Sequence, residues 1–149
     1  MSKKKTFTLE EAHNLLPILK SLLKKAMEAR QRVRQNEKAA RDLKHRILLS
    51  GGLLVDVAAA ARNRAEVVKA CQEIKDAAAE INAIGVQVKD LEIGLLDFPC
   101  VVEDEIVLLC WKHGEERITH WHGPDEGFAG RKPIDQRIAN AKKDRQKPS

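Results

Sequence analysis

The stretch LLPILKSLLKKAMEARQRVRQNEKAARDLKHRILLSGG, residues 15–52, decides the fold of this chain. Its apolar side chains recur from Leu15 to Ile47 at spacings that alternate between four and three residues. This period is typical of the seam of a coiled coil, so the stretch predicts one long amphipathic helix. Pro17 removes one backbone hydrogen bond near the start, where we expect a kink, and Gly51 and Gly52 predict the end.

The following stretch, residues 53–81, repeats the alternating spacing and is followed by Gly85, which predicts the end of a second helix. Two such helices with a short break between them should fold back as an antiparallel hairpin, in which paired residue numbers sum to about 100. One polar residue interrupts each seam, Asn36 in the first helix and Arg64 in the second. Because this pairing places both in one layer, we expect Asn36 and Arg64 to fix the register of the helices.

The second helix has more apolar side chains than a two-helix hairpin can bury. The surplus lies beside the seam, at Ala61, Val68, Ala70, Ala77 and Ile84. It could be covered by the C-terminal segment or by a second chain in a four-helix bundle. Of these two we favour the second chain, so we expect a homodimer.

The composition agrees with long helices. The chain has 149 residues, enough for a single domain, and 43% of them are hydrophobic, 33% charged and 3% aromatic. No aromatic residue occurs from residue 8 to residue 84. Thr8 and Glu11 have the spacing of a capping box, which predicts where the first helix begins. The composition disfavours a β-sandwich, a barrel, a disordered chain and a disulfide scaffold.

After Gly85 the apolar period changes to about two residues, which is typical of strands. We expect a small antiparallel three-stranded meander over residues 95–102, 106–112 and 117–122, with Pro99 at an edge or bulge. Residues 123–131 are rich in glycine and should form an ordered loop, with glycines where a positive φ is needed. The fold class is therefore α+β. We expect a single domain over 1–149, with the hairpin at 6–84, the meander and loop at 85–134, and a basic tail at 135–149.

Charge is segregated along the chain. Residues 1–50 carry 13 basic and 5 acidic side chains, residues 51–130 carry 7 and 15, and residues 131–149 carry 7 and 2. The basic parts could bind nucleic acid through the first helix and the tail, or pair with the acidic part within the molecule or across a dimer. We favour the pairing, because the basic parts are nearly devoid of aromatic side chains on which bases could stack.

The chain shows no targeting or membrane-spanning signal. The lysines near its start are not followed by an apolar segment, and no apolar run approaches the roughly 20 residues that cross a bilayer. Cys71, Cys100 and Cys110 are an odd number without close spacing. We therefore expect a cytoplasmic protein with reduced thiols and no membrane association.

The strongest chemical pattern is His120-Trp121-His122. On a strand, residues i and i+2 share a face, so both imidazoles could bind one divalent transition metal ion. We expect Asp125 to supply the third ligand. Other donors within reach are Glu126, Cys110, His113 and Asp97. The alternative is that His120 is a half-exposed strand residue and that His122 hydrogen-bonds the following turn.

A second pattern is a set of charged residues that could converge between the helices and the meander. The set forms a candidate polar pocket, at Asp90, Asp97, His122, Glu126 and Arg131. Arg131 could hold a carboxylate in bidentate fashion there. The alternative, which we favour, is a structural ion pair that pins the glycine-rich loop.

Several segments together resemble a known family. They are Thr8-Leu9-Glu10-Glu11-Ala12, Gly94-Leu95-Leu96-Asp97-Phe98-Pro99, Leu108-Leu109-Cys110-Trp111 and Asp125-Glu126-Gly127-Phe128-Ala129-Gly130-Arg131. Over residues 6–134 the chain resembles the family called domain of unknown function 2203. The resemblance implies a small bacterial cytoplasmic protein and supplies no activity and no catalytic residues.

Three functions are compatible with the sequence. The first is a non-enzymatic, dimeric helical-bundle protein that acts in interaction or assembly. The second is a metal-binding protein or metalloenzyme that uses His120 and His122, and the third is nucleic-acid binding. We favour the first, because the sequence has no nucleophile elbow, phosphate-binding loop or dinucleotide fingerprint.

Overall fold

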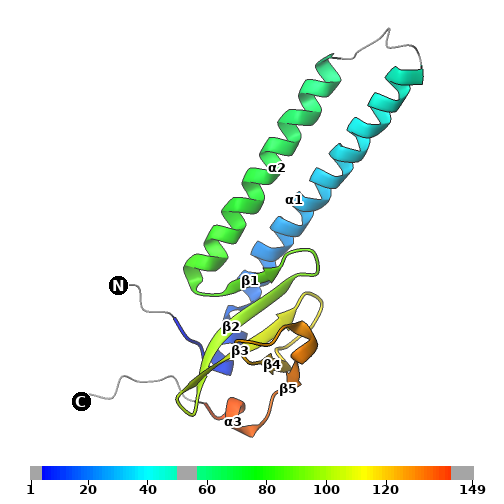
Figure 1. Ribbon diagram of the computed structural model, residues 1–149. Helices are drawn as coiled ribbons and strands as arrows, with labels where there is room; N and C mark the ends of the chain where they lie inside the picture. The colour runs from blue at the N-terminus through cyan, green and yellow to red at the C-terminus, as the bar shows by residue number, and fades with distance from the viewer. Residues whose placement is uncertain (1–4, 50–56, 142–149) are drawn as a thin grey trace. The chain divides into compact units, whose positions relative to one another are not determined.

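The computed structural model describes residues 5–49 and 57–141, and it has an α+β fold (Figure 1). Two long helices come first in the chain, and the strands and two short helical segments follow. The elements are α1 (Leu9–Leu49), α2 (Val57–Ile84), β1 (Gln87–Asp90), β2 (Leu95–Val102), β3 (Glu105–Lys112), β4 (His120–His122), the 3₁₀ helix η1 (Phe128–Gly130), β5 (Lys132–Pro133) and α3 (Gln136–Ala139). No described helix combines the length and the apolarity needed to cross a membrane.

The chain divides into two compact units. The hairpin unit comprises residues 24–77, and the sheet unit comprises residues 1–23 with 78–149. The first turns of α1 and the last turns of α2 thus belong with the sheet, although the periodicity assigns all of 6–84 to a hairpin. The glycine pair at 51–52 and most of the basic tail lie outside the described residues.

Local hydrogen bonds explain two helix ends in the sheet unit. The Thr8 amide donates to Glu11 Oε1 at 2.9 Å, and the Glu11 amide donates to Thr8 Oγ1 at 3.1 Å, which is the predicted capping box. At the end of α2, Gly85 has a φ of +107°. Its amide donates to the Asn82 carbonyl and the Val86 amide donates to the Ile81 carbonyl, the pattern of a Schellman cap. Gly85 therefore ends α2 as the sequence predicts.

The sheet has five antiparallel strands in the sequential order β1-β2-β3-β4-β5, where we expected three. The three predicted strands correspond to β2, β3 and β4, but β4 begins at His120 rather than at residue 117. The additional strands β1 and β5 have four and two residues, too few for an alternating pattern to show in the sequence.

Pro99 lies in the part of β2 that extends beyond its pairing with β1. β1 pairs with residues 95–97 of β2, so the backbone of residue 99 on that side is free of β1. The Pro99 carbonyl points to this side and accepts a hydrogen bond from the Phe7 amide at 2.7 Å. Because the missing N–H of proline faces the same side, it removes no bond from the β2–β3 ladder, as expected of an edge position.

In the hairpin unit, α1 and α2 lie side by side and run antiparallel (Figure 1). The Arg32 guanidinium forms ion pairs with Glu66 and Glu73. The Asn63 amide donates to the Asn36 carbonyl at 3.2 Å. The residue pairs 32/66 and 36/63 agree with the register expected from the seams. Asn36 and Arg64 line one groove between the helices, but the hydrogen bond at this level comes from Asn63.

Candidate metal centre

The register of the central strands sorts their side chains onto two faces of the sheet. On one face the Phe98 ring contacts that of Phe7, with 6.0 Å between centroids, and Trp111 lies beneath the Lys20 ammonium of α1. Residues one position away along each strand point to the opposite face. Asp97 in β2 pairs directly with Cys110 in β3, so both side chains lie on that opposite face.

β4 brings a third side chain to this face. His122 pairs with Leu108, which lies two residues before Cys110 on β3 and therefore shares its face. The cluster of Asp97, Cys110 and His122 thus takes one residue from each of three consecutive strands. All three side chains are buried, with exposures of 0%, 0% and 3%.

The potential ligand atoms of these three residues lie close together. His122 Nε2 lies 3.0 Å from Asp97 Oδ2, and the candidate ligand atoms of the three residues all lie within 4.8 Å of one another. On the other side of the ring, His122 Nδ1 lies 2.8 Å from the Gly123 carbonyl oxygen. The other Asp97 oxygen, Oδ1, is buried and has no partner of regular hydrogen-bond geometry among the described residues.

These contacts define which atoms could bind a cation. A carbonyl oxygen only accepts, so Nδ1 of His122 carries a proton and donates it to Gly123. Nε2 then faces the Asp97 carboxylate, so this nitrogen and the carboxylate oxygens are the atoms available to a cation. In metal-bound histidines, the ring nitrogen that does not bind the metal usually donates to a carbonyl or carboxylate, as Nδ1 of His122 does to Gly123.

Cys110 is unsuited to act as a free nucleophile in this environment. Burial, followed by the negative charge of Asp97, raises the pKa of the Cys110 thiol to about 12. A thiol with so high a pKa is protonated at neutral pH, and nucleophilic attack requires the thiolate. Both ring nitrogens of His122 are also occupied, so His122 is not placed as a base for Cys110. The three residues therefore do not form an activated cysteine site.

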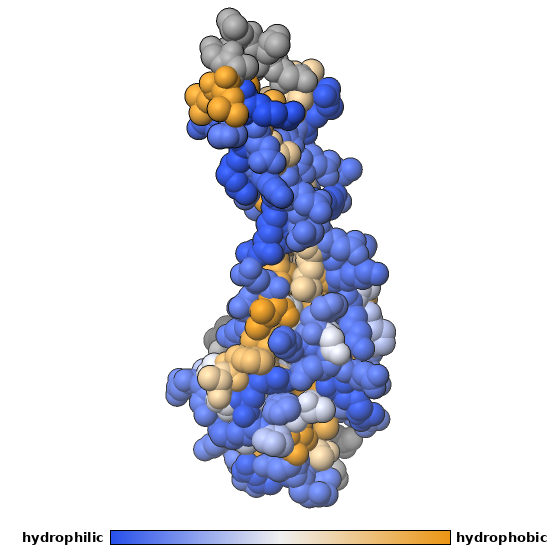
Figure 2. Space-filling view, turned by 90° about the vertical axis from the view of Figure 1, so that its right-hand side faces the viewer, coloured by the Kyte–Doolittle hydropathy of each residue, from blue (hydrophilic) through white to orange (hydrophobic). Residues whose placement is uncertain are grey.

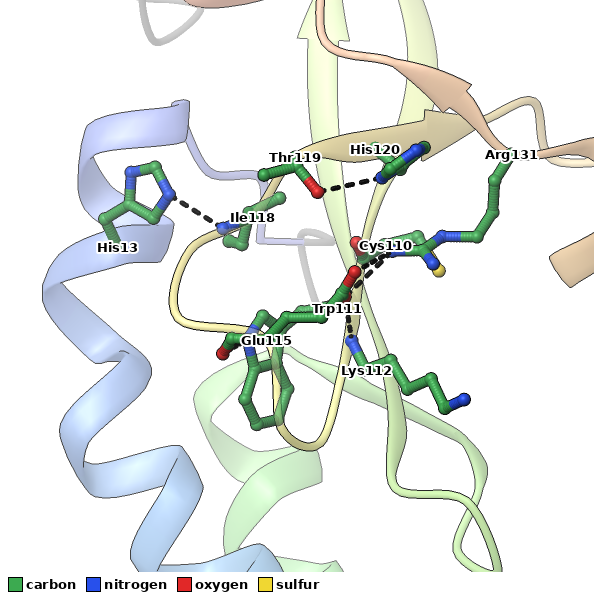
Figure 3. Close-up of polar contacts among 9 residues, drawn as sticks. All are labelled: His13, Cys110, Trp111, Lys112, Glu115, Ile118, Thr119, His120 and Arg131. Carbon is green, nitrogen blue, oxygen red and sulfur yellow. Dashed lines mark hydrogen bonds and ion pairs between the residues drawn. The ribbon is translucent and has the colours of Figure 1, made fainter.

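An ion pair anchors the loop that follows β4 to the sheet (Figure 3). Arg131 Nη2 donates to both carboxylate oxygens of Glu115, at 2.8 and 3.0 Å, and to the Cys110 carbonyl at 3.3 Å. Glu115 also accepts from the Lys112 amide at 2.7 Å. The partner of Arg131 is thus Glu115, a residue outside the predicted polar pocket.

Within the loop, Glu126 has a local structural role. It accepts from the Gly123 amide at 2.9 Å and from Lys132 Nζ at 2.6 Å. The Lys132 hydrogen bond, followed by that of Gly123, lowers the pKa of Glu126. A Cβ on Gly123 or Gly130 would lie 3.0 or 2.9 Å from Glu126 atoms. These loop glycines do not have a positive φ, contrary to our expectation, and instead leave room for the Glu126 side chain.

The remaining predicted site residues are not among the three whose ligand atoms lie within 4.8 Å of one another, although His120 pairs directly with Cys110. His120 is half-buried on the same face of the sheet, and its Nδ1 lies 2.8 Å from Thr119 Oγ1. Asp125 is exposed. Asp90 is also exposed and accepts from the Glu92 amide at 2.9 Å. Of the two proposed constellations, the structure brings together Asp97 and His122, with Cys110 as their neighbour.

Sequence reasoning missed two contacts of the sheet unit. The Ile118 amide donates to His13 Nε2 at 3.0 Å, although His13 has the spacing of a surface helix residue (Figure 3). Burial, followed by the charge of Arg117, lowers the pKa of His13. The second missed contact is that of Glu115 with Arg131. Neither pair has a spacing that sequence alone could have revealed, because 105 and 16 residues separate the partners.

The fold and the cluster define an α+β protein with a buried Asp–Cys–His group on a five-stranded sheet. The chain belongs to the family of uncharacterized conserved proteins DUF2203, whose model matches residues 5–134. Comparisons with curated proteins and with solved structures give no match.

Proposed function

We propose that this protein binds a divalent transition metal ion through Asp97, Cys110 and His122. The observation that carries the proposal is the burial of three different ligand types whose ligand atoms lie within 4.8 Å of one another. Buried polar groups normally have hydrogen-bond partners. Asp97 Oδ1 has no partner of regular hydrogen-bond geometry among the described residues, and the thiol of Cys110 is a weak donor beside this carboxylate. A cation would satisfy this oxygen and bind Nε2 of His122 at the same time.

The spacing of the three residues fits a tetrahedral ion of the zinc class. Bonds of about 2.0 Å to nitrogen and oxygen and about 2.3 Å to sulfur place tetrahedral ligand atoms about 3.3–3.6 Å apart. The 3.0 Å separation of His122 Nε2 and Asp97 Oδ2 is close to that range, and small side-chain movements would bring in Cys110 Sγ. A thiolate–imidazole–carboxylate set favours zinc or cobalt over calcium or magnesium, which prefer oxygen ligands alone.

The three residues would let an ion cross-link strands as a structural ion does, although three protein ligands leave the fourth tetrahedral position to a water molecule. Each ligand lies on a different strand, so the ion would cross-link β2, β3 and β4 in the interior of the sheet unit. A structural site contributes its binding free energy to folding, because the unfolded chain has no preformed site.

Cobalt(II) titration of the untagged, chelator-treated protein tests the proposal. A cobalt ion bound by a thiolate has a sulfur-to-metal charge-transfer absorption in the near ultraviolet. We expect this band for the native protein in a ratio of one cobalt per chain. Cys110→Ser should abolish it, and Asp97→Asn and His122→Gln should weaken cobalt binding at least tenfold, in line with the loss of a direct ligand.

The matched control is His120→Gln, which alters the half-buried histidine on the same strand and face. This variant should bind cobalt like the native protein. If His120→Gln and His122→Gln both lose cobalt binding while Cys110→Ser still binds cobalt, the result would instead support a site formed by His120, His122 and Asp125. If the native protein binds neither cobalt nor zinc, the proposal is wrong.

A further inference from the structure

The hairpin unit leaves its own seam open to solvent. Beyond Ala29 in α1 and Ala70 in α2, no described residue of the hairpin is fully buried. Leu43, Ile47 and Val67 are half-buried, although in a complete coiled coil such residues fill the interior. Two helices alone therefore do not complete this core.

A groove of about 370 Å³ follows the open seam. Ala40, Leu43 and Ile47 of α1 line it on one side, and Ala60 and Val67 of α2 on the other. Figure 2 shows apolar surface among the hydrophilic side chains, including a patch near the top of the view. Beyond the groove, Leu48 and Leu49 are 69% and 75% exposed. An apolar surface of this kind usually marks an interaction site.

The charged residues of the groove indicate what could cover it. The groove has one anion, Glu37, and two cations, Lys44 and Arg64. The residue pairs 32/66 and 36/63 place Arg64 level with Glu37 of the same hairpin, and Lys44 lies about two turns further along α1. When two identical grooves face each other in antiparallel order, Glu37 of each copy can therefore lie near Lys44 of the other. In parallel order, with α1 of one copy against α2 of the other, Glu37 would lie level with Arg64 of the other copy. The groove is therefore self-complementary, as a twofold interface requires.

We propose that a second copy of this chain covers the groove, so that two hairpins form a four-helix bundle. The alternating seams supply the coiled-coil packing, and Ala40 and Ala60 are small enough for the helices of the two copies to approach closely. This inference concerns the hairpin unit and is independent of the metal site, which lies in the sheet unit.

Sedimentation equilibrium of the full chain tests the inference. We expect a concentration-dependent dimer in the native protein. Ala40 is exposed in the single chain, so Ala40→Glu should leave the helix content in circular dichroism unchanged. In the dimer it would bury a carboxylate, and we expect its dissociation constant to rise about tenfold or more.

Ala39→Glu is the matched control, because Ala39 is the adjacent exposed residue and does not line the groove. This variant should dimerise like the native chain. Equal dissociation constants for the two variants would place the interface elsewhere, and a native chain that stays monomeric at every concentration would overturn the inference.

Salt dependence separates a second copy from an acidic partner. Residues 24–77 contain 13 basic and 7 acidic side chains, a net charge of +6. Two such hairpins repel each other through their net charge, while Glu37 of each copy attracts a cation of the other at the groove. Salt screens both effects, so we expect the dissociation constant of the dimer to change little with added salt. An acidic protein or a nucleic acid added to the chain would bind less tightly as salt rises. If the native chain stays monomeric and binds an acidic protein or a nucleic acid less tightly as salt rises, the groove is a site for an acidic partner. That result would contradict the proposed dimer.

Discussion

At the scale of single residues, the three cysteines have different environments. Cys71 is half-buried on α2, whereas Cys100 and Cys110 are buried in the sheet. Burial, followed by the negative charge of Glu11, raises the pKa of Cys100 to about 11, and the pKa of Cys110 is about 12. Thiolate formation at neutral pH is therefore suppressed at both sheet cysteines.

Alkylation of the native protein should therefore modify one thiol. We expect iodoacetamide at pH 8 to label Cys71 rapidly and Cys100 and Cys110 slowly, because alkylation needs an accessible thiolate. Peptide mass spectrometry gives the site of labelling, and in urea all three residues should react. Rapid native labelling of Cys110 would contradict its burial, and Cys71→Ser should remove the fast phase.

His13 should make stability sensitive to mild acid. Its native pKa is lowered, so the unfolded chain takes up the proton first as pH falls below about 6.5. The contribution of His13 is therefore complete above that pH and is lost as pH falls toward the lowered native pKa. We expect urea unfolding to show a smaller loss of stability between pH 7 and pH 5 in His13→Gln than in the native protein. Equal losses would contradict this role.

At the scale of elements, the β2–β3 turn contains two residues with an unfavourable backbone conformation. Val102 pairs with Glu105, so Glu103 and Asp104 form a two-residue turn, and their φ values are +50° and +67°. Two positive values are typical of a type I′ turn, for which Asn-Gly is preferred. This turn fixes the pairing of Asp97 with Cys110 and hence the geometry of the buried Asp97–Cys110–His122 cluster.

Replacing the turn residues should stabilise the sheet unit. The double variant Glu103→Asn, Asp104→Gly keeps the turn and relieves two left-handed residues, so we expect a gain of about 1 kcal/mol in the free energy of unfolding. Urea denaturation measures this gain. A loss of stability would mean that the acidic side chains contribute more than the backbone costs, for example through the Glu103–Arg137 ion pair.

Replacing Gly85, in contrast, should lower the stability of the protein. Its φ of +107° is unfavourable for other residues, and a Cβ would lie 2.8 Å from Cβ of Lys5. Gly85→Ala should therefore lower the free energy of unfolding by about 1–2 kcal/mol. Ala83→Gly, at an exposed position of the same helix end, controls for general effects of exchanging alanine and glycine.

The sequence predicted the helices and the main strands better than it predicted the Asp97–Cys110–His122 cluster. The helices follow from seams many turns long, and Thr8, Glu11 and Gly85 identify two helix ends through local chemistry. The pairing of Asp97 with Cys110 depends on a two-residue turn, and Glu103-Asp104 lacks the Asn-Gly signal that would have revealed it. The sequence thus predicts candidate ligands, but their convergence depends on strand register.

At the scale of the whole molecule, a metal ion should change the stability of the fold. Zinc that binds the native state stabilises it in proportion to the logarithm of its concentration over the dissociation constant, about 4 kcal/mol at a thousandfold excess. We expect zinc to raise the melting temperature and a chelator to reverse the effect. A tenfold loss of affinity in Asp97→Asn should lower this stabilisation by about 1.4 kcal/mol, so zinc should raise the melting temperature of the variant less than that of the native protein. An undiminished zinc effect in this variant would indicate binding elsewhere.

The contact of His13 with Ile118 has a consequence for synthesis on the ribosome. These residues are 105 positions apart, and the Phe7 amide likewise bonds to a carbonyl at position 99. The first turns of α1 leave the ribosome early but lack these partners until late in translation. Residues 24–77 are available together well before that point, and units generally fold as they emerge. We therefore expect the hairpin to fold first. The first turns of α1, although they are synthesised early, should pack against the sheet last.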